Sequence, residues 1–244
     1  MAKQKMHGLQ VLALVSLFTV MLSFIPGASM LTYPFRLFVT FIHEGGHALM
    51  AVLTGGSVRA LSIHPDASGE TYSLGGIPLL IASAGYLTSA IYGASLLALC
   101  RDGRNAKAAL ILTAVAILAL TLCYASGMLS VGAGLGIPIV LVFVALACKE
   151  SWAHFFAMFL AIQCSLNALI DLRTLFFLSA TTNVQSDAAN MAEMTHVPAL
   201  FWTLLWIGGS LFILWRALRS YGNPYAREAT VAAPRGKRRA YANS

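Results

Sequence analysis

The stretch that decides the fold of this chain reads Phe41-Ile42-His43-Glu44-Gly45-Gly46-His47-Ala48. Its three ionisable side chains fall within five positions, inside the otherwise largely apolar run of residues 35–53. A charged side chain at the centre of a membrane costs on the order of 3 kcal/mol on insertion scales, so such residues rarely collect there without a function. The stretch therefore indicates a functional site on a membrane helix.

The composition excludes an ordinary soluble domain. Hydrophobic residues make up 58% of the 244 residues and charged residues only 10%, whereas a soluble globular domain carries roughly 25% charged residues. The four cysteines form no C-x-x-C pair and lie in or beside apolar runs, so we interpret them as small core residues and not as a disulfide scaffold. We therefore predict an integral membrane protein.

Seven apolar runs approach the length of about 20 helical residues that a bilayer core of about 30 Å requires. They cover residues 9–25, 35–53, 77–99, 108–124, 128–147, 152–178 and 198–218. The predicted fold is an all-α polytopic membrane protein with about seven transmembrane helices. The first run also has the basic flank and the small following residues of a cleaved signal peptide, which is the alternative for that run.

A short β-hairpin is predicted between the second and third runs, within residues 54–76. Residues 58–63 alternate in side-chain character, the stretch from His64 to Gly69 is rich in turn-forming residues, and a pair of glycines stands near each end of the segment. This hairpin is expected to lie against the helices.

Basic residues are concentrated at the C-terminal end. Of the 16 lysines and arginines behind the net charge of +7, seven lie between Arg216 and Arg239, beside the last apolar run. This position favours anionic lipids over nucleic acid as the partner of the basic segment. The distribution of lysine and arginine among the loops predicts a cytoplasmic C-terminus. We divide the chain into a membrane domain, residues 1–220, and a flexible basic tail, residues 221–244.

The H-E-x-x-H spacing of the decisive stretch is that of zinc hydrolases. His43 and His47 share one face of a helix and can converge on one metal ion, while Glu44 can reach a water molecule bound to that ion. Gly45 and Gly46 permit close approach of another backbone, which is either a neighbouring helix or a substrate. The alternative interpretation is that both histidines make interhelical hydrogen bonds and Glu44 is a protonated packing residue.

Residues 43–56, HEGGHALMAVLTGG, resemble the H-E-x-G-H-A-x-x-A-x-x-x-G signature of the site-2 protease family, the intramembrane zinc metalloproteases. Ser83-Ala84-Gly85-Tyr86 resembles an A-G-P element of that family, with Tyr86 in place of proline. The chain looks most like the small bacterial branch without PDZ or CBS domains, which implies a bacterial cell membrane. The resemblance implies a helical core with a short sheet, Zn²⁺ held by both histidines and a distant aspartate, and Glu44 as the base.

A catalytic zinc ion typically has three protein ligands. The family's aspartate follows an N-x-x-P element and lies in an L-D-G context; this chain has Asn167 and Asp171, but no proline between them and Leu172 in place of glycine. We predict Asp171 as the third ligand, because it is the only acidic residue near the interior of another apolar run. The alternative is a helix-end carboxylate that is paired with Arg173 or capped by Asn167. Asn167, one turn earlier, is predicted to orient the ligand or to bind a reaction oxyanion. The competing candidates, which we interpret as loop or interfacial residues, are Asp187, Glu193, His196, His154 and His64.

The predicted function is hydrolysis of a peptide bond in a transmembrane protein substrate, with Glu44 activating a zinc-bound water. An edge strand of the hairpin is expected to hold the substrate in an extended form. One alternative is a catalytically silent relative that binds membrane proteins and lacks a complete ligand set. The other is a transporter or proton relay, which the absence of an internal repeat and of a second buried charge cluster disfavours.

Overall fold

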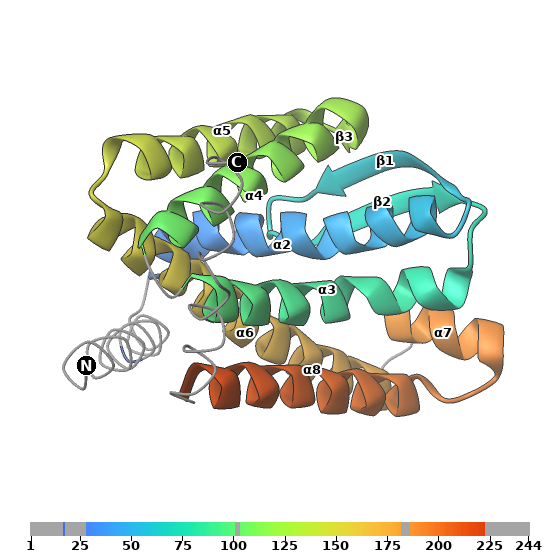
Figure 1. Ribbon diagram of the computed structural model, residues 1–244. Coiled ribbons are helices and arrows are strands. Elements are labelled where there is room, and N and C mark those ends of the chain that lie inside the picture. Colours follow the sequence, from blue (N-terminus) through green and yellow to red (C-terminus); the bar gives the residue numbers. More distant parts are fainter. Residues whose placement is uncertain (1–16, 18–27, 101–102, 182–185, 223–244) are drawn as a thin grey trace, which may run out of the picture.

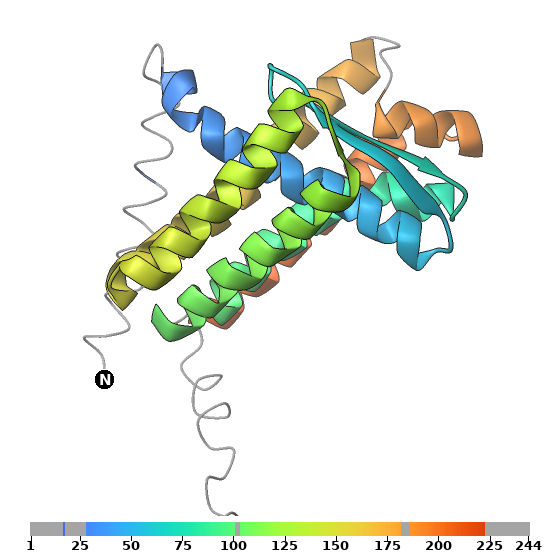
Figure 2. The same ribbon diagram turned by 90° about the horizontal axis from the view of Figure 1, so that it is seen from above.

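The computed structural model describes residue 17 and residues 28–100, 103–181 and 186–222. Most of these residues lie in helices, which stack in layers, and a small sheet lies at one side of them alongside α2 (Figure 1). The helices are α2 (Ala28–Leu53), α3 (Pro78–Leu99), α4 (Gly103–Tyr124), α5 (Met128–Ala147), α6 (Glu150–Thr181), α7 (Asp187–Thr195) and α8 (Ala199–Gly222). The hairpin of α4 and α5 forms one outer layer and α8 the opposite one, so that α2 and α3 are enclosed between them (Figures 1 and 2).

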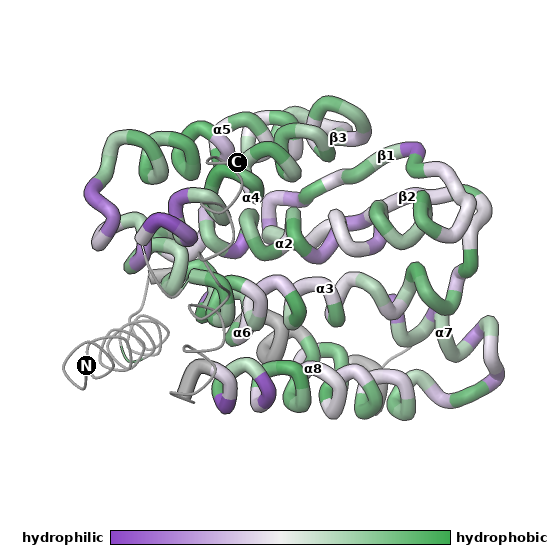
Figure 3. Tube along the Cα trace, in the orientation of Figure 1, coloured by the Kyte–Doolittle hydropathy of each residue, from purple (hydrophilic) through white to green (hydrophobic). Residues whose placement is uncertain are grey.

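Four helices in the described part of the chain are long and apolar enough to cross a membrane, namely α3, α4, α5 and α8. Figure 3 shows hydrophobic residues along most of their length. The chain is an integral membrane protein by this criterion. Helices α2 and α6 cover two more of the predicted runs but are not among the four, and the first predicted run lies outside the described residues except for residue 17. The total of about seven crossings stays a prediction.

Helix α2 is the central element of the fold. Its buried residues Phe38 and Phe41 join a hydrophobic cluster with residues of α3, α4, α5 and α6, as expected when apolar positions recur at helical spacing. The helix ends where Gly55 adopts a φ of 82°, which a residue with a side chain rarely takes, and the N–H of Gly56 donates to the carbonyl of Ala51 at 2.8 Å. The chain then turns directly into the sheet.

The sheet has three strands in the order β2-β1-β3. Strand β1 (Ser57–Ile63) pairs antiparallel with β2 (Gly69–Leu74), with an irregularity between Val58 and Ala60, and pairs in parallel with the two-residue strand β3 (Ala125–Ser126). The sequence predicts the hairpin of β1 and β2 but not β3, because a segment of two residues between two apolar runs is too short to show a strand periodicity. Strand β2 is an edge strand, and no other described strand pairs with its second side.

The tip of the hairpin between β1 and β2 is bonded to the N-terminal half of α2. The guanidinium of Arg36 donates to the carbonyl of Asp66 at 2.6 Å, and the hydroxyl of Thr40 donates to the carbonyl of Ala67 at 2.7 Å. The carboxylate of Asp66 in turn accepts the N–H and the hydroxyl of Ser68 at 2.9 and 2.7 Å. These bonds hold the hairpin along α2 and bring β2 next to the H-E-x-x-H motif.

Candidate metal centre

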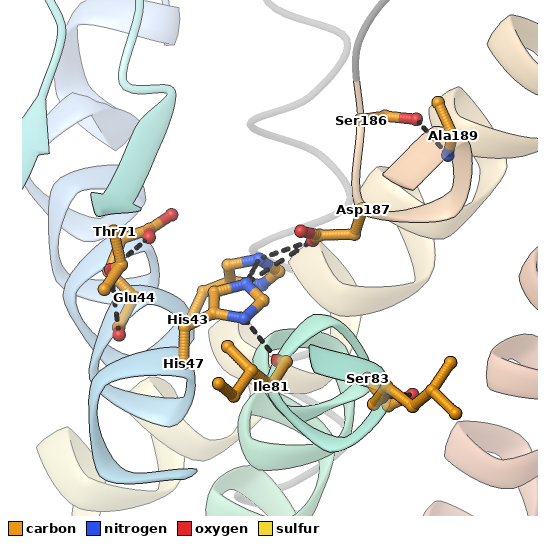
Figure 4. Close-up of polar contacts among 10 residues, drawn as sticks. His43, Glu44, His47, Thr71, Ile81, Ser83, Ser186, Asp187 and Ala189 are labelled. Atoms are coloured by element: carbon orange, nitrogen blue, oxygen red, sulfur yellow. Dashed lines mark hydrogen bonds and ion pairs between the residues drawn. The ribbon is translucent and has the colours of Figure 1, made fainter. Parts of the chain in front are cut away.

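The two histidines of the motif converge as their spacing predicts. Their Nε2 atoms lie 3.1 Å apart, because residues four apart on a helix occupy the same face. The Nδ1 of His47 lies 2.7 Å from the carbonyl of Ile81 in α3 (Figure 4). A carbonyl only accepts hydrogen bonds, so Nδ1 carries a proton and donates, and Nε2 is the atom of the neutral ring that remains for a metal ion.

A carboxylate approaches this pair from the other side of the site. The Oδ2 atom of Asp187 lies 3.6 Å from the Nε2 of His43 and 3.4 Å from the Nε2 of His47. Asp187 is the first residue of α7, and the side chain of Ser186 caps that helix by accepting the N–H of Ala189 at 3.2 Å (Figure 4). The described residues thus form one group of ligand atoms that lie within 4.8 Å of one another and could hold a metal ion: His43, His47 and Asp187.

Asp187 is held in its anionic form. Burial by itself raises the pKa of this carboxyl, but hydrogen bonds from the protonated forms of His43 and His47, together with the positive charge of these rings, outweigh burial and hold the pKa well below its usual range. A metal ion requires deprotonated ligands. The electrostatics of the site therefore suit a cation placed between the three side chains.

Gly85 of α3 keeps the space in front of both imidazoles open. A β-carbon built at this position would meet the Nε2 atoms of His43 and His47. The next residue, Tyr86, packs its ring edge against His43, with ring centroids 4.7 Å apart, and stacks on Trp206 of α8 at 5.3 Å. Tyr86 of α3 and Trp206 of α8 therefore form an aromatic stack beside His43.

Glu44 points toward the hairpin. Its side chain is buried, with 4% of the residue exposed, and its Oε2 accepts the hydroxyl proton of Thr71 in β2 at 2.7 Å. Figure 4 shows Glu44 next to Thr71, on the side of the histidines opposite Asp187. The carboxylate is thus adjacent to the cluster without being one of its three members.

The two motif glycines lie at helix contacts. A β-carbon at Gly46 would come within 2.8 Å of the Ala84 carbonyl in α3, and one at Gly45 would meet the side chain of Leu120 in α4 at 2.8 Å. Close packing of neighbouring helices therefore requires small residues here. A role of these glycines in binding a substrate stays a prediction.

The acidic residue that lies beside the histidines is Asp187. The sequence predicts Asp171 for this role. Asp171 and Asn167 lie on α6, but their side chains fall outside the described residues, so their predicted roles stay predictions. Asp187 stands outside every apolar run, and for this reason the sequence predicts a loop residue at this position. Its one local signal is the pair Ser186-Asp187, which is typical of a helix start.

The other competing candidates lie elsewhere. His64 pairs with Glu70 across the hairpin, with Nε2 and Oε1 3.6 Å apart. Glu193 and His196 are exposed at the C-terminal end of α7, where His196 ends the helix in the left-handed conformation. His154 lies near the start of α6. None of the four belongs to the described group that could hold a metal ion.

The family of the chain follows from a comparison with protein-family models. Neither the curated proteins nor the solved structures gave a match. The model of the family described as Peptidase M50B-like matches residues 10–217, which include α2 to α7 and most of α8. This match confirms the resemblance to the site-2 proteases. The chain belongs to the Peptidase M50B-like family.

Proposed function

We propose that this chain is a zinc-dependent intramembrane endopeptidase that cleaves a membrane-embedded protein. The convergence of two imidazoles and one carboxylate next to the glutamate of an H-E-x-x-H motif carries this proposal. Around a tetrahedral zinc ion with bonds of about 2.0–2.1 Å, ligand atoms lie about 3.3 Å apart. The three separations here are 3.1, 3.4 and 3.6 Å, so both the donor types and their spacing fit zinc.

His43, His47 and Asp187 would hold the ion, and the carbonyl of Ile81 fixes the ring of His47 for this role. When bound, zinc supplies Lewis acidity, which lowers the pKa of a water molecule and polarises the scissile carbonyl. Glu44 accepts the proton of the attacking water and delivers it to the nitrogen of the leaving amine. The water oxygen bonds to the carbonyl carbon first, and the C–N bond then breaks as the nitrogen receives the proton from Glu44.

The substrate is proposed to bind as an added strand. A transmembrane helix hides its carbonyls in hydrogen bonds, so the segment to be cleaved must first unwind. The second side of β2 offers backbone groups to an extended segment, and β2 lies beside Glu44 through Thr71. This arrangement supports a protein substrate over a small molecule.

Purified protein in detergent tests the proposal. The wild type and the Glu44→Gln variant are compared for bound metal and for cleavage of a peptide that contains a transmembrane segment. We expect the wild type to contain about one zinc ion per chain and to cleave the peptide. Glu44→Gln should retain zinc and lose at least about 100-fold in kcat, because general-base catalysis typically contributes 10²–10⁴-fold.

Two results would contradict the proposal. Full activity of Glu44→Gln would exclude Glu44 as the base. A wild-type protein that binds zinc but cleaves no transmembrane peptide, across a panel of sequences, would favour the catalytically silent relative.

A further inference from the structure

We infer that Thr71 is a positioning residue that fixes the carboxylate of Glu44, so that strand β2 orients the base as well as the substrate. This inference rests on the proposed function, because it assigns a role within the same site. It concerns a residue of the hairpin that is remote in sequence from the H-E-x-x-H motif.

Thr71 makes two contacts with the same glutamate. Its Oγ1 lies 2.7 Å from Oε2 of Glu44 and 3.2 Å from the main-chain carbonyl of Glu44. A hydroxyl has one proton to donate, and the charged carboxylate at the shorter distance is the stronger acceptor. Thr71 therefore holds Oε2, and Oε1 of the same carboxylate faces Gly69 of β2.

The side chain of Glu44 lies directly against the backbone of β2. A β-carbon at Gly69, the first residue of β2, would lie 2.7 Å from both Cγ and Oε1 of Glu44. Glycine at this position lets the strand approach the carboxylate closely, and Thr71 then meets it from the same strand. The 4% exposure of Glu44 indicates that this contact excludes bulk water.

The strand that carries Thr71 is itself fixed to α2. The bonds from Arg36 to the Asp66 carbonyl and from Thr40 to the Ala67 carbonyl hold the hairpin tip just before β2 begins. Thr40 is one helical turn before Glu44 on the same helix, so the tip and the base share one rigid support. The distance between Thr71 and Glu44 is therefore set by two separate attachments.

Strand β2 would contact the substrate through its backbone and the base through Thr71. A strand added to the free edge of β2 would lie about 4.8 Å from β2. Because Thr71 belongs to β2, its hydroxyl fixes Glu44 relative to the backbone with which the substrate pairs. Loss of the hydroxyl should lower kcat and spare KM, since the backbone groups of β2 remain available.

The test compares Thr71→Val, which has nearly the same shape without the hydroxyl, with Thr71→Ser, which retains it. We expect Thr71→Val to lower kcat about 10- to 100-fold, the range for loss of a hydrogen bond to a charged group. KM should change less than about threefold, and the zinc content should match that of the wild type. Thr71→Ser should restore kcat to within about threefold of the wild type, because the donor is retained.

Thr121→Val is the matched control. The hydroxyl of Thr121 is buried in α4 and donates to the carbonyl of Ile117 at 2.7 Å. This variant removes a buried threonine hydroxyl outside the site, so its kcat should equal that of the wild type. Thermal unfolding of all three variants, followed in the same detergent, checks that they are folded.

The inference is wrong if Thr71→Val keeps the wild-type kcat, if it raises KM alone, or if Thr71→Ser is as impaired as Thr71→Val. The two variants Glu44→Gln and Thr71→Val distinguish a failure of this inference from a failure of the proposed function. An inactive Glu44→Gln together with a fully active Thr71→Val would remove only the role of Thr71. An active Glu44→Gln would remove the protease proposal itself.

Discussion

The two sides of the candidate metal centre are built in different ways. On one side, His43 and His47 stand one turn apart on a single helix, and the carbonyl of Ile81 fixes the second ring. On the other side, Asp187 comes from the first turn of the nine-residue helix α7, far along the chain. The histidine side depends mainly on the geometry of one helix, with one hydrogen bond to α3, whereas the aspartate side depends on how α7 packs against the rest of the molecule.

This difference has a mechanical consequence. Residues within a long helix move together, but α7 is short and owes its position to contacts with α3, α6 and α8. A short isolated helix is marginally stable in water, so tertiary contacts must supply its stability. The carboxylate side should therefore be the easier side of the site to weaken.

Removal of the carboxylate should have the largest effect. We expect Asp187→Ala to reduce zinc affinity more than about 100-fold, since even residues that only support metal ligands account for 10- to 100-fold. Asp171→Ala tests the ligand predicted from the sequence, and Glu193→Ala is the control on the same helix as Asp187. Zinc content after dialysis at a fixed free zinc concentration measures all three. If Asp171→Ala alone loses the metal, the aspartate ligand is on α6 and not on α7.

A methyl group placed against both imidazoles should have an intermediate effect. Gly85→Ala puts a β-carbon against the Nε2 atoms of both histidines, so we expect zinc affinity to fall about 10- to 100-fold, a loss comparable to that of a residue supporting the ligands. Gly93→Ala is the matched control on α3, because its β-carbon would meet Ser165 and the Ala161 carbonyl of α6. It should change stability without changing zinc affinity. Normal zinc binding by Gly85→Ala would mean that the ion does not occupy the space between the imidazoles.

Loss of the α7 cap should have the smallest effect. Ser186→Ala removes the acceptor for the Ala189 N–H, which costs about 1 kcal/mol in a typical helix. If this destabilisation of α7 also loosens the position of the Asp187 carboxylate, zinc affinity should fall by up to about fivefold. Ser186→Thr keeps the cap and should bind zinc like the wild type. Identical zinc affinities of Ser186→Ala and the wild type would show that tertiary contacts alone hold α7.

Much of the site was predictable where the chemistry is local. The H-E-x-x-H spacing predicted the convergence of His43 and His47, and the resemblance carried by residues 43–56 predicted the family that the match confirms. Turn residues and alternation predicted strands between α2 and α3, where β1 and β2 form. The third strand β3 was not predictable, because two residues pair with β1 only through tertiary packing.

The sequence by itself determined that this is a membrane protein with two imidazoles and a carboxylate on one helix, because hydrophobicity, helical periodicity and motif spacing are properties of neighbouring residues. Only the tertiary structure decided that Asp187 approaches both histidines, that Thr71 holds Glu44, and that Gly85 faces the imidazoles. These contacts join residues separated by long stretches of chain. No local pattern encodes them, since they arise when helices and strands bury their apolar faces against one another.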